Sequence, residues 1–199
     1  MRIALIPCGR TEWRDEGRLL GRVEVPLLPG SHEICGEWLT ALQPLGLERI
    51  YHAPDELASQ TALLLAKRLS VPAKPLPNLA EVDVGLWAGL TDEQLRARFA
   101  TAHRELCEAP LNVVPPEGEG LADAAERLSK CVGRQIRKSG SAAIGIITRP
   151  LGLAMIRCVL EGRGFADVWE AAQSPDEVVV LDSDPTPGAR RPPRGTAAA

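Results

Sequence analysis

Short apolar runs alternate with longer amphipathic segments along the chain. The apolar runs, each bounded by proline, glycine or charged residues, predict β-strands over residues 2–6, 49–52, 142–148 and 177–181. The amphipathic segments predict helices over residues 31–42, 56–69, 91–106 and 121–138. This alternation favours an α/β fold, a three-layer α/β/α sandwich with a mostly parallel central sheet.

Residue types at the helix ends agree with these boundaries. Ser31 is a candidate N-cap for the first helix. Thr91, with Gln94 three residues later, has the pattern of a capping box for the third. The second helix ends on Lys67 and Arg68, and positive charges are favourable at a helix C-terminus.

Three segments lack helical or strand periodicity. Residues 72–78 and 108–120 are rich in proline and glycine, so we expect irregular connections there. Residues 184–199 have no apolar pattern at all, which is typical of disorder. The sequence therefore predicts one folded domain over residues 1–183 and a disordered tail.

Composition excludes several classes of function. The 199 residues carry a net charge of -3 with both signs interspersed, which argues against nucleic-acid binding. No window approaches the about 20 apolar residues that span a membrane. The five cysteines are scattered and form no Cys-x-x-Cys pair, which indicates reduced thiols in a cytoplasmic protein without a metal site. We expect no cofactor.

The end of the first apolar run carries the most informative motif. It stops abruptly at Pro7-Cys8-Gly9-Arg10-Thr11 and continues with Glu12-Trp13-Arg14. This segment resembles the start of the histidine phosphatase (phosphoglycerate mutase-like) superfamily, where the corresponding motif is Arg-His-Gly-Glu-Thr. The position of the phosphate-accepting histidine holds Cys8.

Further fragments follow in the order of that family over residues 1–182. They comprise a Gly-Arg-x-x-Gly stretch, a Pro-Leu pair, a Gln-Thr-Ala helix start, a Leu-x-Glu segment followed by Gly-x-Trp, and a Pro-Pro turn. In this sequence they are Gly17-Arg18-Leu19-Leu20-Gly21, Pro26-Leu27, Gln60-Thr61-Ala62, Leu79-Ala80-Glu81, Gly85-Leu86-Trp87 and Pro115-Pro116-Glu117-Gly118-Glu119. The resemblance implies the histidine phosphatase fold.

The same resemblance implies an altered site. The family surrounds a phosphoryl group with two arginines and two histidines, and a carboxylic acid protonates the leaving oxygen. Here the corresponding basic positions hold Pro7, Cys8, Leu57 and Arg149. The loop asparagine after the first motif is replaced by Arg14, and only the acid, Glu81, persists. The three histidines, His32, His52 and His103, lie outside the motif positions.

Two kinds of chemistry at the altered site stay open. Arg10, Arg14 and Arg149 lie on loops that would converge near Cys8, so these guanidinium groups, with Gly9 and Thr11, are candidates for binding an anion. The alternative is that they are solvated or paired with nearby carboxylates. A cationic neighbourhood would also lower the pKa of Cys8 and make it reactive.

A second pattern at Cys8 is less specific. Cys8 and Arg14 fit the Cys-x5-Arg pattern of cysteine phosphatases at a strand end. Cys131 and Arg137 fit it equally well inside a predicted helix, where no phosphate-binding loop forms. The pattern therefore arises readily by chance, and it is a weak signal of cysteine-phosphatase chemistry at Cys8.

The function that the resemblance implies is a pseudoenzyme with a binding or regulatory role. Its expected partners are a small anionic or phosphorylated ligand, and a second copy of the chain or another protein. The alternative is an active phosphomonoesterase or phosphoglycerate mutase-like enzyme that uses Cys8 as nucleophile and Glu81 as acid. The balance of replaced residues favours a protein that is not an enzyme.

Overall fold

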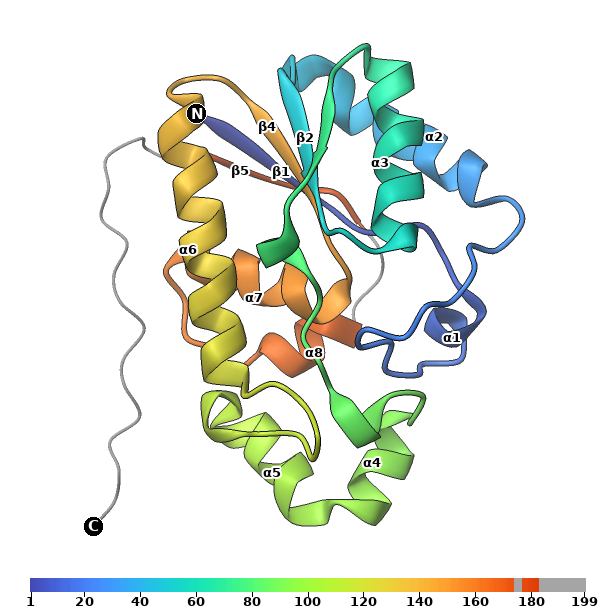
Figure 1. The fold of residues 1–199 in the computed structure, drawn as a ribbon, viewed down its shortest axis with the longest axis vertical. Helices are drawn as coiled ribbons and strands as arrows, with labels where there is room; N and C mark the ends of the chain where they lie inside the picture. The colour runs from blue at the N-terminus through green and yellow to red at the C-terminus, as the bar shows by residue number, and fades with distance from the viewer. Residues whose placement is uncertain (174–176, 183–199) are drawn as a thin grey trace.

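A five-stranded sheet forms the centre of the molecule (Figure 1). The computed structural model describes residues 1–173 and 177–182. The strand order is β3-β2-β4-β1-β5, in which β5 alone of these strands runs antiparallel to its neighbour. The bounds are β1 (Arg2–Ile6), β2 (Arg49–His52), β3 (Ala73–Pro75), β4 (Ile144–Ile147) and β5 (Val179–Asp182). The predicted α/β class with a mostly parallel sheet is confirmed.

Helices cover both faces of this sheet. In Figure 1, α2 and α3 lie on one side of it and α6 and α7 on the other, while α4, α5 and α8 lie beyond one end of the strands. The helix bounds are α1 (Glu12–Asp15), α2 (Ser31–Leu42), α3 (Glu56–Leu69), α4 (Asp92–Arg98), α5 (Ala100–Glu108), α6 (Leu121–Ser139), α7 (Pro150–Glu161) and α8 (Val168–Gln173). Short 3₁₀ turns are η1 (Gln43–Leu45), η2 (Pro77–Leu79), η3 (Gly85–Trp87) and η4 (Pro110–Asn112).

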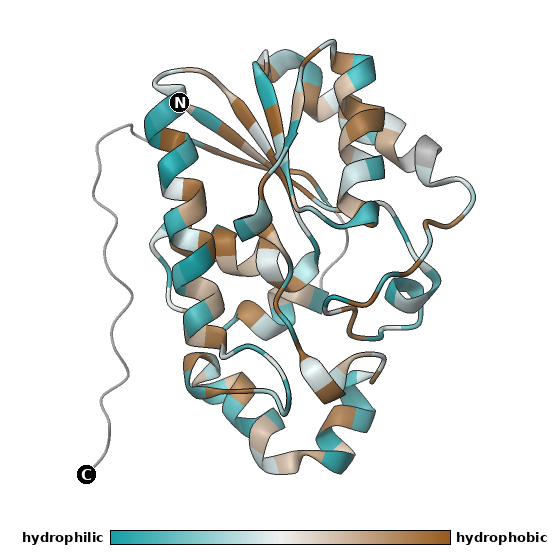
Figure 2. Cartoon of the chain, viewed as in Figure 1, coloured by the Kyte–Doolittle hydropathy of each residue, from teal (hydrophilic) through white to brown (hydrophobic). Residues whose placement is uncertain are grey.

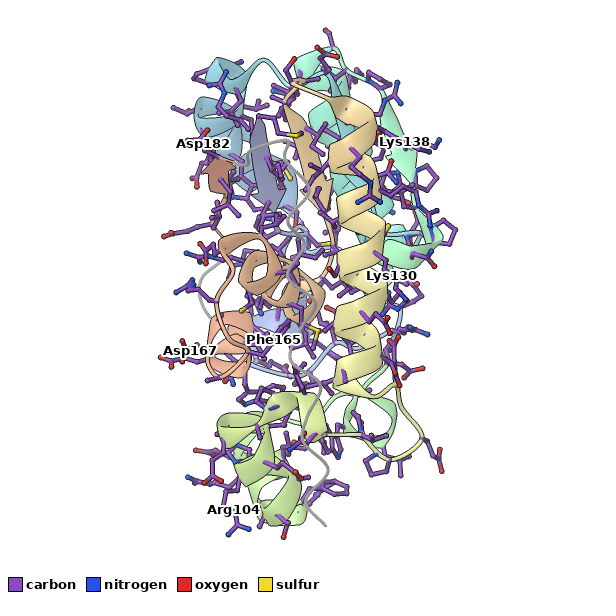
Figure 3. All side chains as sticks on the ribbon, turned by 90° about the vertical axis from the view of Figure 1, so that its left-hand side faces the viewer. Arg104, Lys130, Lys138, Phe165, Asp167 and Asp182 are labelled. Atoms are coloured by element: carbon purple, nitrogen blue, oxygen red, sulfur yellow. The ribbon has the colours of Figure 1, made fainter. Side chains whose placement is uncertain are left out.

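The core lies between the sheet and these helices. Ile3 to Ile6 of β1 and Ile144 to Ile147 of β4 are buried, because strands in the middle of the sheet are covered on both faces. Figure 2 shows hydrophobic and hydrophilic residues alternating along α6. Its buried residues recur every three or four positions, whereas Lys130 and Lys138, labelled in Figure 3, are exposed.

Two of the predicted strands have different bounds. The strand predicted over residues 142–148 covers Ile144–Ile147, and that predicted over 177–181 covers Val179–Asp182. The prediction of an irregular connection over 72–78 is wrong for Ala73–Pro75, which forms the edge strand β3. Proline masked this strand in the sequence, but an edge strand tolerates it because its outer N–H groups have no strand partner.

Two helix predictions also need correction. The helix predicted over residues 91–106 is two helices, α4 and α5, because Phe99 leaves helical geometry with φ -132° and ψ 47°. This break allows Phe99 to pack on Trp87 with ring centroids 5.9 Å apart. The predicted N-cap Ser31 is the first helical residue, and Gly30, with φ 89°, is the N-cap. The capping box of Thr91 and Gln94 is confirmed.

The remaining prediction concerns the end of the chain. The predictions of a disordered tail over residues 184–199 and of a domain boundary at residue 183 concern residues outside those that the structure describes. Among the helices of the described part, none is long and apolar enough to cross a membrane.

Candidate functional site

The carboxyl ends of three parallel strands meet at one edge of the sheet. Ile147 of β4 is in register with Ile6 of β1 and with His52 of β2. The loops that follow these strands therefore start side by side. They carry Cys8 after β1, Asp55 after β2 and Arg149 after β4.

The loop after β1 is tightly packed. Cys8 is 5% exposed and belongs to the hydrophobic core. The Gly9 amide donates to Thr61 Oγ1 at 3.0 Å, and a Cβ at Gly9 would lie 2.6 Å from a methyl carbon of Leu27. Thr11 is buried and caps α1, since its hydroxyl accepts from the Arg14 amide at 3.1 Å. Gly9 and Thr11 thus have structural contacts of their own.

Two of the three candidate arginines, Arg10 and Arg14, bind groups of α1 and α8. Arg10 is exposed and forms a two-point ion pair with Asp15, at 3.0 Å from Nε to Oδ1 and 2.7 Å from Nη2 to Oδ2. Arg14 donates from Nη1 to the carbonyl of Ala172 in α8 at 2.6 Å. These contacts tie Arg10 to α1 and join the α1 loop to α8.

Arg149 has the most protected guanidinium of the three, with a side chain 0% exposed. Its Nε donates to Asp55 Oδ1 at 3.0 Å, and its Nη1 donates to the carbonyls of Gly21 and Val23 at 3.0 and 2.5 Å. Its Nη2 reaches Glu24 Oε2 at 3.3 Å. Arg149 therefore holds the 21–24 loop against the start of α3.

Glu81 binds the N-terminus of α7. This buried carboxylate accepts from the amides of Leu151 and Gly152 at 3.1 and 2.7 Å, and from its neighbour Val82 at 2.6 Å. The first turn of a helix presents unpaired N–H groups and a partial positive charge, so it is an anion site. Here the chain supplies the anion itself. Gly152 permits this contact because a Cβ would lie 3.0 Å from Glu81 Oε1.

Opposing influences act on the pKa of Glu81. Burial raises it from the ordinary value of 4.5 to about 7. The three backbone N–H bonds and the Arg149 charge act in the other direction and are outweighed. A carboxyl group with such a pKa exists in both protonation states near neutral pH.

The remaining sequence candidates have plain structural surroundings. Leu57 is buried at 2% exposure in the first turn of α3. His52 is buried, with Nδ1 2.7 Å from the Ala53 carbonyl oxygen. His103 contacts Asp92 at 2.8 Å between Nε2 and Oδ1. Within residues 1–173 and 177–182, no cluster of His, Cys, Asp and Glu is arranged to hold a metal ion.

Sequence reasoning missed two acidic partners of the site. Asp55 is the N-cap of α3, accepting from the Ala58 amide at 3.1 Å, and Glu24 lies on the loop after Gly21. The Asp-Glu pair before the helix at residue 56 is an N-cap signal that could have identified Asp55. No local pattern marks Glu24, because its contact with Arg149 depends on the tertiary fold.

Two cavities meet at Glu81. One, of about 320 Å³, is lined by Arg22, Glu24, Pro54, Asp55, Glu81 and Arg149. The other, of about 150 Å³, lies toward α8, with Trp169 and Ala172 among its lining residues. The candidate site is therefore a buried polar cluster between two hollows.

The fold and this site define the class of protein: an α/β/α domain whose candidate site gathers at the carboxyl ends of parallel strands, with a buried carboxylate at the N-terminus of the helix after β4. The profile of the histidine phosphatase superfamily (branch 1) matches residues 3–189, and the chain belongs to this superfamily.

Individual relatives are distant in sequence. Phosphoserine phosphatase 1 of Hydrogenobacter thermophilus is 21% identical over 169 residues, covering 85% of this chain and 80% of the relative. The adenosylcobalamin/alpha-ribazole phosphatase of Salmonella typhimurium is 25% identical over 169 residues, covering 85% and 84%. Among solved structures, YhfR of Bacillus stearothermophilus matches with a TM-score of 0.79 at 21% identity, covering 94% of this chain and 92% of that one. This structural match shows the shared fold.

Proposed function

We propose that this chain is a catalytically degenerate histidine phosphatase-like protein, a pseudoenzyme with a binding or regulatory role. The main support for the proposal is the burial and bonding of Arg149, the residue that the sequence resemblance aligns with the family's second histidine. Its guanidinium is wholly buried and bonded to Asp55, Glu24 and two backbone carbonyls. A guanidinium held in this way neither attacks a phosphoryl group nor clamps one.

The first loop supports the same proposal. Cys8 replaces the nucleophilic histidine and is 5% exposed, so a phosphate ester in solution has little access to its sulfur. Pro7 and Leu57, at the positions of the family's two arginines, offer no side-chain donor to a phosphoryl oxygen. Losing one such donor costs about 3 kcal/mol of transition-state stabilisation in comparable sites.

One observation favours an active enzyme as a second candidate. The pKa of Glu81, raised by burial to about 7, suits a general acid at neutral pH. In that case Cys8 would attack the phosphorus and Glu81 would protonate the leaving oxygen. Both oxygens of Glu81 already accept backbone N–H bonds, which counts against this role.

Hydrolysis assays distinguish the two candidates. An aryl phosphate and a panel of sugar and glycerate phosphates are incubated from pH 5 to 8 with the wild type, with Cys8→Ser and with Cys107→Ser, a control at an exposed cysteine. We expect no turnover above background in any of the three. Turnover that disappears in Cys8→Ser and persists in Cys107→Ser would overturn the pseudoenzyme and make Cys8 a nucleophile.

The binding partner stays a prediction. The relatives act on the phosphorylated compounds that their names give, and a small anionic or phosphorylated ligand is the expectation from the sequence. Arg10, Arg14 and Arg149 each bind protein groups, so an anion would have to compete with Asp15, Ala172 or Glu24 for them. Calorimetric titration with inorganic phosphate tests this expectation, and light scattering tests the expected homodimer.

A further inference from the structure

A small apolar cavity lies where the α1 loop, the start of α7 and α8 meet. We call it the α8 cavity; its volume is about 150 Å³. Aliphatic and aromatic side chains make up much of its wall, namely Leu19, Leu20, Val84, Leu151 and Trp169. The cavity is also lined by the carboxylates of Glu81 and Asp92 and the guanidinium groups of Arg14 and Arg18. A mostly apolar hollow with few polar groups is the usual form of a small-molecule site.

The charged side chains around the α8 cavity are bound to the protein. Asp92 Oδ1 accepts from Trp169 Nε1 at 2.9 Å and lies 2.8 Å from His103 Nε2. Arg18 donates from Nη1 to the Gly89 carbonyl at 2.8 Å and pairs with Glu16. The Arg14 guanidinium contacts the Ala172 carbonyl. The indole of Trp169 is thereby fixed in place, which gives the cavity a rigid wall.

The charge arrangement disfavours a phosphate group in this cavity. A phosphate dianion would face the carboxylates of Glu81 and Asp92. To gain a favourable contact it would have to draw Arg14 or Arg18 away from its carbonyl partner. An uncharged molecule needs no such rearrangement. Burial of its apolar surface in the cavity is favourable, and no charge has to be removed from water.

The size of the cavity limits the ligand to a single ring. An engineered protein cavity of about 150 Å³ with aliphatic and aromatic walls binds benzene. The α8 cavity has the same volume and apolar side chains on much of its wall, but Arg14, Arg18, Glu81, Asp92 and Gln173 line it as well. Glu81 Oε2 accepts an N–H bond from Leu151, and a carboxylate oxygen can accept two. A hydroxyl or N–H group on the ring would find its acceptor there.

We propose that the α8 cavity binds an uncharged, ring-sized organic molecule with one hydroxyl or N–H donor directed at Glu81, and that it discriminates against the phosphate ester of the same molecule. This inference rests on the proposed function, because a site that turns over phosphate esters would have to accept them.

The test compares phenol with phenyl phosphate at pH 7.5 on the isotope-labelled full chain. Phenol titration is expected to shift the indole N–H resonance of Trp169 and the amides of Leu20 and Leu151, with a Kd on the order of 1 mM. The amide of Leu63, an exposed residue of α3, is expected to stay unchanged. Phenyl phosphate is expected to bind at least about tenfold more weakly.

Matched variants locate the site. Leu19→Trp places an indole in the cavity wall and should abolish the phenol shifts, while Leu86→Trp adds the same group at a side chain outside the cavity and should leave them intact. Circular dichroism verifies that both variants fold. If Leu19→Trp does not fold, the wild-type titrations with phenol and phenyl phosphate still test the proposal.

Three outcomes would overturn the inference: phenyl phosphate binding as tightly as phenol, phenol shifts that avoid Trp169, or no binding of phenol. Release of inorganic phosphate from phenyl phosphate, followed by ³¹P resonance in the same sample, would instead overturn the proposed function. The binding data therefore test the further inference, and the release of phosphate tests the proposed function.

Discussion

Asp55 and Arg149 form a buried ion pair at 3.0 Å between Oδ1 and Nε, and the same Asp55 oxygen caps α3. The pair joins the loops after β2 and β4, and Arg149 extends the connection to the 21–24 loop through two carbonyls. One guanidinium thus links three segments at the edge of the sheet where the carboxyl ends of β1, β2 and β4 meet.

Removal of this guanidinium should be costly. Arg149→Met leaves the buried Asp55 carboxylate and two carbonyls without their donor, and breaking a buried pair in this way costs about 3–5 kcal/mol. Arg10→Met breaks the exposed pair with Asp15 and should cost at most about 1 kcal/mol. Urea unfolding of the two variants measures both values. Equal losses would show that Arg149 does not organise the site.

Glu81 should make stability depend on pH. Its pKa is 4.5 ordinarily and about 7 in the folded chain, so the folded state binds the proton more tightly than the unfolded state. The resulting stabilisation is complete below pH 4.5 and is lost as pH rises to 7. Relative to Glu81→Gln, which does not titrate, the free energy of unfolding of the wild type should fall by about 2–3 kcal/mol between pH 5 and 8.

Urea unfolding of wild type and Glu81→Gln at both pH values measures this difference. Asp92, Glu119 and Glu161, whose pKa values are lowered, act in the opposite direction, but they are common to both proteins and cancel. A difference that does not change with pH would mean that Glu81 is not the titrating group.

Thiol reactivity should separate the cysteines by exposure. Cys107 is exposed, whereas Cys8, Cys35, Cys131 and Cys158 are buried. Burial also raises the pKa of Cys35 to about 11, which removes its thiolate at neutral pH. We expect brief alkylation of the native protein, followed by peptide mass spectrometry, to modify Cys107 first. Modification of Cys8 ahead of Cys107 would contradict the burial of Cys8 and would favour the alternative in which Cys8 is a nucleophile.

Gly85 should resist substitution for two reasons at once. Its φ of 49° lies in the left-handed region, and a Cβ would come within 2.1 Å of the Pro116 carbonyl oxygen. Gly46 has a φ of 60° with open space around it, so Gly46→Ala measures the backbone strain alone. We expect about 1 kcal/mol of destabilisation for Gly46→Ala and at least about 2 kcal/mol more for Gly85→Ala. Thermal unfolding compares them, and equal shifts would exclude the steric contact.

Much of the fold followed from local sequence. The apolar runs at residues 2–6 and 49–52 are buried strands, and the helices 31–42 and 56–69 have the predicted bounds, because periodicity and end signals act over a few residues. The edge strand at Ala73–Pro75 was not predicted because Pro75 and the preceding Pro72 disfavour a strand except at an edge, and edge position is a property of the whole sheet.

For the site, local sequence shows which side chains stand at the candidate positions, namely Cys8, Arg149 and Glu81. What these side chains bind depends on the tertiary structure. Asp55 and Glu24 reach Arg149 across 94 and 125 residues, and Leu151 and Gly152 reach Glu81 across 70 and 71. Burial and partners over such separations arise from the packing of strands and loops, on which local patterns carry no information.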